Sequence, residues 1–394
     1  MAQHGDGLIL VRGAAPSGPS ANFFYLTGLA ESRGALLLAP QGARIGIGAR
    51  HPGPDYVRGR MVRQILFLPA SDPLAARWGE DGTATAEHWT PERAGVDVIL
   101  EATELAPLLG RLLQEAPTLH YVRGAPPSLV GHEDEDAAFV SRVRQRFFGV
   151  AVRDATPTVH ELRRTKDEAE VRAIERSIEL TGEALGRTLG LLRAGMHEYE
   201  VEGEISRVYR GHGAGHAFDP IIASGLNAVF PHYKDNAAEI ESGRLLLIDT
   251  GAVVNGYCSD VTRTVPVDGR FDERQREVYE TVLSAQRAAI ELCRPGALLA
   301  DIHSAAFHVI ESAGFGRYFI HGTSHHLGLE THDAGDIHRP LTAGSVITVE
   351  PGIYIPDEQI GVRIEDDVLV TTDRPRVLSE AIPVSVEDIE RRMA

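Results

Sequence analysis

The sequence has little cysteine, and its two cysteines, Cys258 and Cys293, are too few for a disulfide framework in a chain of 394 residues. Their separation is also not that of paired metal ligands. A chain without a disulfide framework fits a reducing compartment. The first seven residues lack the basic stretch followed by an apolar stretch that marks a secretory signal. We therefore expect a cytoplasmic protein.

The sequence also lacks an excess of basic residues and lacks long apolar runs. Its 56 Asp and Glu outnumber its 39 Lys and Arg, which gives a formal net charge of −17. Sequence-independent binding to phosphate backbones needs clustered Lys and Arg, so we do not expect nucleic acid as a partner. No apolar run reaches the roughly 20 residues that span a bilayer, so we do not expect membrane association. Part of the negative charge fits a divalent cation site, since such ions gather carboxylates.

The composition is otherwise that of a globular protein, with 43% hydrophobic and 24% charged residues in a chain long enough for two domains. Short apolar runs, such as 8–11 and 35–39, alternate with Gly and Pro and predict a compact α/β domain over residues 1–150. We expect helices there near 102–116 and 134–148. The stretch 149–159 has little periodic apolar pattern, so we place the boundary there, with a second domain over 151–394.

The second domain combines amphipathic helices with strand-like runs. Apolar residues at helical spacing predict helices over 166–192, 199–209 and 272–292. Short apolar runs predict strands over 245–249, 261–265, 346–350 and 362–365. Helices that alternate with strands without a short regular repeat favour an α+β or mixed arrangement and exclude a solenoid.

Acidic residues stand at the ends of these predicted strands. Asp249 closes the run Leu-Leu-Leu-Ile, and Asp260 precedes Val-Thr-Arg-Thr eleven residues later. Glu350 closes Val-Ile-Thr-Val, and Glu365 closes the last of the four runs. Burying a carboxylate at the end of an apolar strand is costly unless a cation or hydrogen bonds compensate its charge. Two such strand ends side by side therefore predict a metal site.

Histidine is concentrated between residues 321 and 332, where four histidines occur in twelve residues beside Gly322 and Gly328. Imidazole is the commonest neutral nitrogen ligand for transition metals. Four carboxylates and one imidazole suit a pair of divalent ions that share bridging carboxylates. Because the ligand set is rich in oxygen, it favours Mn²⁺, with Zn²⁺ and Co²⁺ as alternatives.

These motifs resemble those of the pita-bread metallopeptidases, in the branch of aminopeptidase P and prolidase. The five matching motifs are Ile248-Asp249-Thr-Gly, Ser259-Asp260-Val-Thr-Arg-Thr, His321-Gly-Thr-Ser-His325, Thr348-Val-Glu350-Pro-Gly and Arg363-Ile-Glu365-Asp. They occur in the family's order within residues 158–383. The resemblance implies an α+β fold, in which a pita-bread (creatinase/aminopeptidase-like) catalytic domain follows a smaller α/β domain of the creatinase type.

The resemblance also implies roles for individual residues. Asp249 would bind one of two divalent ions, His325 and Glu350 the other, and Asp260 and Glu365 both. Three further histidines of the family fall on His232, His321 and His332, and they would line the substrate pocket. Arg363 and Tyr354 would orient the ligands and the substrate. Glu350 would also carry a proton from the attacking water to the proline nitrogen.

The implied reaction is hydrolysis of the bond before a proline in second position of a small peptide, and two substrate ranges stay open. The motif His-Gly-Thr-Ser-His-His-Leu-Gly favours an aminopeptidase P that acts on longer peptides. The short first domain favours an Xaa-Pro dipeptidase, as does the absence of tryptophan at residues 57–60, where aminopeptidase P enzymes often have Trp-x-Gly-Arg. We prefer the dipeptidase.

A dipeptidase needs a group that pairs with the free proline carboxylate, and arginine is suitable. Arg44, Arg50 or Arg58 would supply it, and we name Arg50 as the candidate substrate-binding residue. The first domain would then control substrate length. By analogy with the family it would also form a homodimer.

Three other functions fit the same fold. Methionine aminopeptidase shares the ligand pattern, but its chain usually lacks a preceding domain of this size. Creatinase-like hydrolases have lost the metal ligands, which are all present here. A non-catalytic peptide- or protein-binding module is the alternative of a different class, and retained ligands argue against it.

Overall fold

The computed structural model describes residues 7–15, 18–45, 61–78, 84–124 and 135–394. The chain divides into two compact units, Met1–His160 and Glu161–Ala394. This division lies ten residues beyond the expected boundary at residue 150. The reason is that strand β8 (Ala151–Asp154) pairs in parallel with β7 (Thr118–Val122) and so extends the sheet of the first unit.

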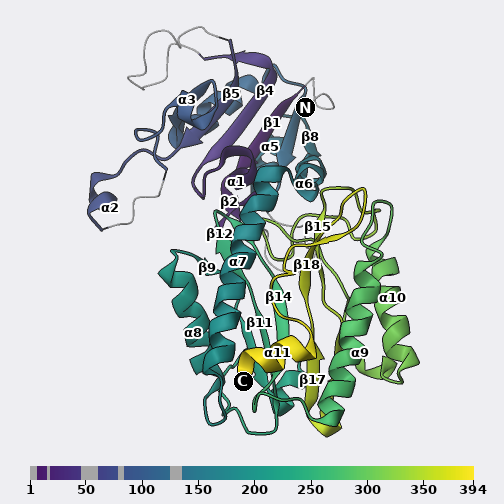
Figure 1. The fold of residues 1–394 in the computed structure, drawn as a ribbon. Helices are drawn as coiled ribbons and strands as arrows, with labels where there is room; N and C mark the ends of the chain where they lie inside the picture. Colours follow the sequence, from purple (N-terminus) through teal and green to yellow (C-terminus); the bar gives the residue numbers. More distant parts are fainter. Residues whose placement is uncertain (1–6, 16–17, 46–60, 79–83, 125–134) are drawn as a thin grey trace. The chain divides into compact units, whose positions relative to one another are not determined.

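The first unit is built on a six-stranded mixed sheet in the order β6-β5-β4-β1-β7-β8 (Figure 1). Its remaining strands are β1 (Leu8–Arg12), β4 (Ala35–Arg44), β5 (Met61–Leu68) and β6 (Val98–Glu101). The pairs β1/β4 and β4/β5 are antiparallel, whereas β5/β6, β1/β7 and β7/β8 are parallel. Strand β2 (Ala14–Ala15) pairs in antiparallel register with β3 (Gly18–Pro19).

Alternate residues of this sheet enter two separate hydrophobic cores. Leu8 and Leu10 of β1 belong to one core, whereas Ile9 and Val11 belong to the other, as the two-residue period of a strand requires. The helical segments of the unit are α1 (Ala21–Thr27), α2 (Pro73–Trp78), α3 (Pro91–Ala94), η3 (Ala102–Glu104), α4 (Leu105–Leu112), α5 (Glu135–Arg146) and α6 (Thr156–Arg164), which runs into the second unit. Since α4 and α5 contribute to one core and α1 to the other, both faces of the sheet are covered.

The second unit repeats one order twice, a pair of helices followed by antiparallel strands. The first repeat contains α7 (Glu168–Leu191), α8 (Glu198–Gly211), β10 (Ile221–Ser224), β11 (Leu245–Thr250) and β14 (Val261–Pro266). The second contains α9 (Glu273–Ile290), α10 (Leu299–Ser312), β15 (Val346–Val349), β18 (Asp366–Leu369) and β19 (Arg376–Val377). Figure 1 shows α7 and α8 on one side of the strands of this unit and α9 and α10 on the other.

Smaller elements complete the second unit. They are β9 (Gly215–His216), η4 (Gly225–Val229), β12 (Ala252–Val254), β13 (Tyr257–Cys258), η5 (Gly316–Tyr318), β16 (Gly352–Ile355), η6 (Pro356–Glu358), β17 (Ile360–Arg363) and α11 (Val386–Met393). Strands β9, β12 and β13 form a small sheet, and β16 and β17 form a hairpin.

The side chains of β11 show how the core of this unit orients the site. Leu246 and Ile248 join the main core between the helices and the strands. Leu247 faces the opposite side and packs with Ile221 in a separate small cluster. Asp249 is two residues beyond Leu247, so its side chain lies on that same side, away from the main core.

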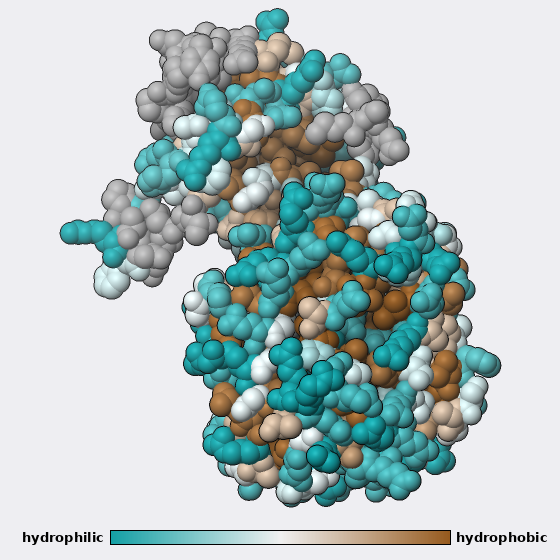
Figure 2. Space-filling model, in the orientation of Figure 1, coloured by the Kyte–Doolittle hydropathy of each residue, from teal (hydrophilic) through white to brown (hydrophobic). Residues whose placement is uncertain are grey.

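On the face shown in Figure 2, the second unit carries many hydrophilic side chains, with apolar side chains between them. Such scattered apolar exposure is ordinary for a folded protein. Within the described ranges, no helix combines the length and the apolar character that crossing a membrane requires.

Candidate metal centre

Asp249 and Asp260 lie next to each other because β11 and β14 pair in antiparallel register. Thr250 is opposite Val261 in that register, so Asp260 comes just before the paired stretch, beside the end of β11. The connection needs a glycine at position 251. A Cβ atom there would lie 1.8 Å from the backbone oxygen of Ser259, which is far inside van der Waals contact.

Glu350 and Glu365 come together in the same way in the second repeat. Strands β15 and β18 pair with Val349 opposite Asp366, so the residues just beyond these ends, Glu350 and Glu365, are neighbours. The backbone N–H of Glu365 donates to the carbonyl oxygen of Thr262 at 3.1 Å, which ties this pair to β14. The four carboxylates therefore come from two strand pairs that meet.

His325 has the tautomer and the orientation of a metal ligand. Its Nδ1 lies 3.1 Å from the backbone oxygen of His326, which only accepts, so Nδ1 carries the hydrogen. The other nitrogen, Nε2, keeps its lone pair and lies 3.5 Å from Oδ2 of Asp260 and 3.6 Å from Oε1 of Glu350. A backbone acceptor on the second nitrogen is the usual way in which proteins fix a ligating histidine.

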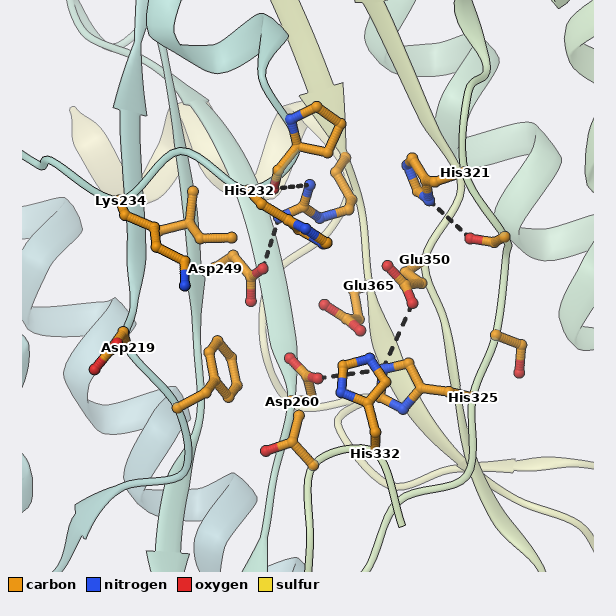
Figure 3. A pocket seen from close by; sticks show the side chains of 17 residues that line it. Asp219, His232, Lys234, Asp249, Asp260, His321, His325, His332, Glu350 and Glu365 are labelled. Carbon is orange, nitrogen blue, oxygen red and sulfur yellow. Dashed lines mark hydrogen bonds and ion pairs between the residues drawn. The ribbon is translucent and has the colours of Figure 1, made fainter. Parts of the chain in front are cut away.

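These side chains point into one cavity of about 750 Å³ (Figure 3). Ligand atoms of Asp260, His325 and Glu365 lie within 4.8 Å of one another. Two atoms that share one ion at about 2.1 Å lie roughly 3 to 4 Å apart, so the spacing between His325 and its carboxylate neighbours fits direct ligation. The cavity volume is within the usual range for small-molecule sites.

Asp249 offers one further oxygen for a cation. Its Oδ2 accepts a hydrogen bond of 2.6 Å from Nη2 of Arg363, and both side chains are buried. Its Oδ1 is buried and has no hydrogen-bond partner among the described residues. A buried carboxylate oxygen without a partner is costly, and a metal ion in the cavity would satisfy it.

The electrostatics of the centre match a site that holds cations. Burial raises the pKa of Asp260 and of Glu365 well above their ordinary values, and neighbouring carboxylates add to this effect. Burial likewise raises the pKa of Glu350 to about 7, against the opposing effect of Arg363. Burial and the proximity of His332 lower the pKa of His325 to about 4, which keeps its imidazole neutral.

The other predicted pocket residues surround this centre. His232, His321, His332 and Arg363 all line the cavity, and the rings of His332 and His325 lie 4.1 Å apart. Tyr354 lies beneath, where its hydroxyl accepts from Nη1 of Arg363 at 2.9 Å and lies 2.8 Å from Nε2 of His321.

The hydrogen-bond pattern also defines the state of His321. Its Nδ1 is bonded to the carbonyl oxygen of Gly322, so Nε2 accepts from the Tyr354 hydroxyl. Burial, with a smaller effect of Arg363, lowers the pKa of His321 to about 4. The ring is therefore a neutral, oriented wall of the cavity. Arg50, the last predicted site residue, lies outside the described residues.

Several contributing residues were not predicted from the sequence. Thr262 donates to Oε2 of Glu365 at 2.8 Å, and the buried Asp367 accepts from the backbone N–H of Asp260 at 3.1 Å. Phe218, Asp219 and Lys234 also line the cavity, but they lie outside the five matching motifs. The sequence offered a signal for Thr262 and Asp367, since each is two residues from a predicted ligand.

The comparisons with known proteins agree with this geometry. The model of metallopeptidase family M24 matches residues 172–372. An Xaa-Pro aminopeptidase of Haemophilus influenzae is 31% identical over 94% of this chain and 87% of its own length. The chain belongs to metallopeptidase family M24. An Xaa-Pro dipeptidase of Pyrococcus furiosus is also similar, at 40% identity over 56% of this chain and 65% of its own length.

A solved structure extends the likeness over nearly the whole chain. Aminopeptidase P of Escherichia coli with the inhibitor Pro-Leu superposes with a TM-score of 0.83 at 29% identity, covering 98% of this chain and 93% of that one. The predicted fold, a pita-bread catalytic domain after a smaller α/β domain, is thereby confirmed. The prediction of a metallopeptidase is confirmed as well.

Proposed function

We propose that this M24 peptidase hydrolyses the peptide bond before a proline in the second position of a peptide, at a centre of two divalent ions. The ligands in this proposal are Asp249, Asp260, His325, Glu350 and Glu365. The observation that carries it is the convergence of four buried or half-buried carboxylates with the free Nε2 lone pair of His325 in one cavity. The names of the relatives that match most of the chain support the substrate class.

The charge of the centre supports two ions over one. Four carboxylates and the guanidinium of Arg363 give a formal charge of about −3 in a largely buried place. One divalent ion would leave −1, whereas two would give +1, which suits an anionic nucleophile and a polarised carbonyl. Because oxygen ligands dominate, we propose Mn²⁺, with Zn²⁺ and Co²⁺ as alternatives.

In the reaction, divalent ions lower the pKa of a coordinated water and polarise the substrate carbonyl. The chain's own residues then move the proton and orient the groups. Glu350 accepts the proton of the attacking water and delivers it to the proline nitrogen, which leaves as a secondary amine. His332 and His232 donate to the oxygen of the tetrahedral intermediate, and Arg363 holds Asp249 in place through its hydrogen bond of 2.6 Å.

The wall formed by His321 is suited to the proline ring. The neutral ring of His321 is held by Tyr354 and packs edge-on against Phe319 at 5.5 Å between centroids. A flat, oriented surface of this kind can bind the apolar face of a proline with little loss of side-chain entropy.

For substrate length we propose an aminopeptidase that accepts peptides longer than two residues. The dipeptidase preferred on the sequence is not contradicted, since an Xaa-Pro dipeptidase is among the relatives. However, that relative matches 56% of this chain, whereas the Xaa-Pro aminopeptidases of Haemophilus influenzae and Escherichia coli match 94% and 96% of it. A cavity of about 750 Å³ also leaves room for residues beyond the proline.

Four further predictions remain proposals. The first unit limits substrate length and forms a homodimer, Arg50 contacts the substrate, and the protein works in the cytoplasm. Sedimentation of the purified chain tests the dimer. The ratio of dipeptide to tripeptide turnover in Arg50→Ala tests Arg50, because loss of a carboxylate contact would lower dipeptide turnover selectively.

The proposed function is tested with the purified chain loaded with Mn²⁺, Zn²⁺ or Co²⁺ in turn. We expect release of the first residue from Ala-Pro-Leu, no cleavage of Ala-Ala-Leu, and slower cleavage of the dipeptide Ala-Pro. Glu350→Gln should lower kcat by about 10² to 10⁴. Tight binding of peptides without turnover in any metal form would instead favour the non-catalytic binding module.

A further inference from the structure

One cation that lines the cavity has no partner among the described residues. Lys234 lies between η4 and β11, its side chain is exposed, and it lines the cavity of the metal centre. Figure 3 shows its ammonium group directed into the cavity on the side of Asp249, while the carboxylate of Asp219 points away. Within the part of the chain that the structure describes, Lys234 makes no ion pair or side-chain hydrogen bond.

The composition makes this lysine unusual in the chain. The sequence has only two lysines among its 39 basic residues, so arginine supplies almost all of the positive charge. The other lysine, Lys166, is buried and paired with Asp333 at 2.9 Å. Lys234 is thus the chain's single exposed lysine, and it stands in the cavity of the proposed active site.

The backbone that carries Lys234 is held firmly. The hydroxyl of Tyr233 and the backbone N–H of Ala238 both donate to Oε2 of Glu198 at 2.9 Å, and Glu198 is fully buried. Asn236 accepts from the backbone N–H of Ile222 at 3.0 Å. The residues on both sides of Lys234 are therefore anchored, and the ammonium group reaches the cavity from a fixed point.

Arg363 is the arginine that lines the cavity, and its guanidinium already donates hydrogen bonds within the protein. Its guanidinium donates to Asp249 at 2.6 Å, to Tyr354 at 2.9 Å and to Thr262 at 3.2 Å. An anionic group that enters with the substrate would therefore pair with Lys234.

The position of Lys234 indicates which part of the substrate it meets, and this step rests on the proposed function. With the proline against His321 and the scissile carbonyl at the metal ligands, the preceding residue extends to the opposite wall. Figure 3 shows Lys234 and His321 on opposite sides of the carboxylates. We propose that Lys234 is a specificity-determining residue that selects peptides with an acidic side chain, Asp or Glu, before the proline.

The chemistry of the lysine side chain suits an acidic partner. A lysine ammonium on a flexible stem can follow side chains of two lengths, which suits both Asp and Glu. A charge-assisted pair at a partly exposed site corresponds to roughly a three- to tenfold preference.

The test compares Glu-Pro-Leu, Gln-Pro-Leu and Lys-Pro-Leu as substrates of the metal-loaded full chain. We expect a kcat/KM ratio of Glu to Gln of about three to ten. The ratio should be kept in Lys234→Arg, fall to about one in Lys234→Met, and fall below one in Lys234→Glu with a gain for Lys-Pro-Leu. Arg187→Met, on the exposed surface of α7, is the control variant and should keep the wild-type ratio.

Two results would overturn the inference. One is an equal ratio in the wild type and Lys234→Met. The other is a loss in Lys234→Met that affects Ala-Pro but not the amide Ala-Pro-NH₂, because Lys234 would then bind the terminal carboxylate. Cleavage of none of these peptides by the wild type would refute the proposed function itself, which keeps the two failures distinct.

Discussion

A buried ionic cluster beside the metal centre provides the sharpest test of how the site is held. Asp333 follows His332 in sequence, and its side chain is 1% exposed. It accepts a hydrogen bond of 2.9 Å from Lys166 and a short one from Arg163, whose side chains are 1% and 2% exposed. The cluster joins the segment before α7 to the loop that carries the histidines.

Removing the carboxylate should be costly. Loss of one partner from a buried ion pair typically costs about 3 to 5 kcal/mol, since the remaining charge is left unpaired. Asp333→Asn leaves two buried cations, so we expect a destabilisation toward the upper end of that range. This is a large part of the roughly 5 to 15 kcal/mol that stabilises a typical domain. Glu330→Gln is the matched control, because Glu330 also pairs with Arg163 but is 55% exposed, and we expect less than about 1 kcal/mol.

The pH dependence follows from the same contacts. Burial alone would raise the pKa of Asp333, but Lys166 and Arg163 outweigh it and hold the pKa below its ordinary value. A folded-state pKa below the unfolded value of about 3.9 stabilises the protein above that pH. The contribution is lost as pH falls through the folded pKa. The stability difference between the wild type and Asp333→Asn should therefore be full near pH 7 and shrink below about pH 4.

Amide hydrogen exchange is the suitable assay, because two units need not unfold in one transition. Exchange of peptides from the loop 326–336 should accelerate in Asp333→Asn and stay near the wild-type rate in Glu330→Gln. A loss of less than 1 kcal/mol in Asp333→Asn, or an equal loss in both variants, would refute the assignment of this cluster as a buried anchor.

Three further predictions concern the site. Removing divalent metal by chelation should abolish turnover and lower the Tm, and adding Mn²⁺ should restore both. A ligand at a thousandfold excess over its Kd adds about 4 kcal/mol of stability. Turnover that survives dialysis against a chelator would contradict a metal-dependent reaction. Glu198→Gln should cost about 1 to 3 kcal/mol and lower kcat more than it raises KM. Glutamine keeps only one of the two acceptor oxygens, so it cannot satisfy both the donors on the segment that carries His232 and those near Ser224. Unchanged kinetics would argue against this anchoring. Gly251→Ala should purify with much less bound metal, because the added Cβ atom would collide with the backbone oxygen of Ser259. Gly203→Ala in α8 is the control and should bind metal normally, because a Cβ atom there meets nothing within 4 Å.

Much of the second unit could be predicted because its signals are local. The predicted helix over 166–192 is observed as Glu168–Leu191, and Asp167 caps it with the reciprocal hydrogen bonds of a capping box. The predicted strand over 346–350 is observed as Val346–Val349, and Glu350 comes directly after it. A run of apolar residues and the polar residue that ends it are both properties of a few consecutive positions.

Other elements escaped prediction for different reasons. Helix α10 buries Leu299, Ile302, Ala306 and Ile310, which lie at helical spacing and could have been recognised. Strands β5 to β8 depend on pairings between distant segments, which no local pattern specifies. The same holds for the pair of Lys166 and Asp333, whose members are 167 residues apart in the chain.

The proposed ligands could be named from the sequence, whereas the residues that support them could not, and the architecture explains this difference. Asp249 and Asp260 come from the first helix–strand repeat, Glu350 and Glu365 from the second, and each sits where an apolar strand ends. Mutual repulsion of these carboxylates would push the two repeats apart, whereas cations between them hold the repeats together. Metal binding should therefore stabilise both repeats as one cooperative body. The residues that hold the site in position act through contacts that form only in the folded chain. The hydrogen bonds from Tyr233 and Ala238 to Glu198, which fix the segment around His232, are an example.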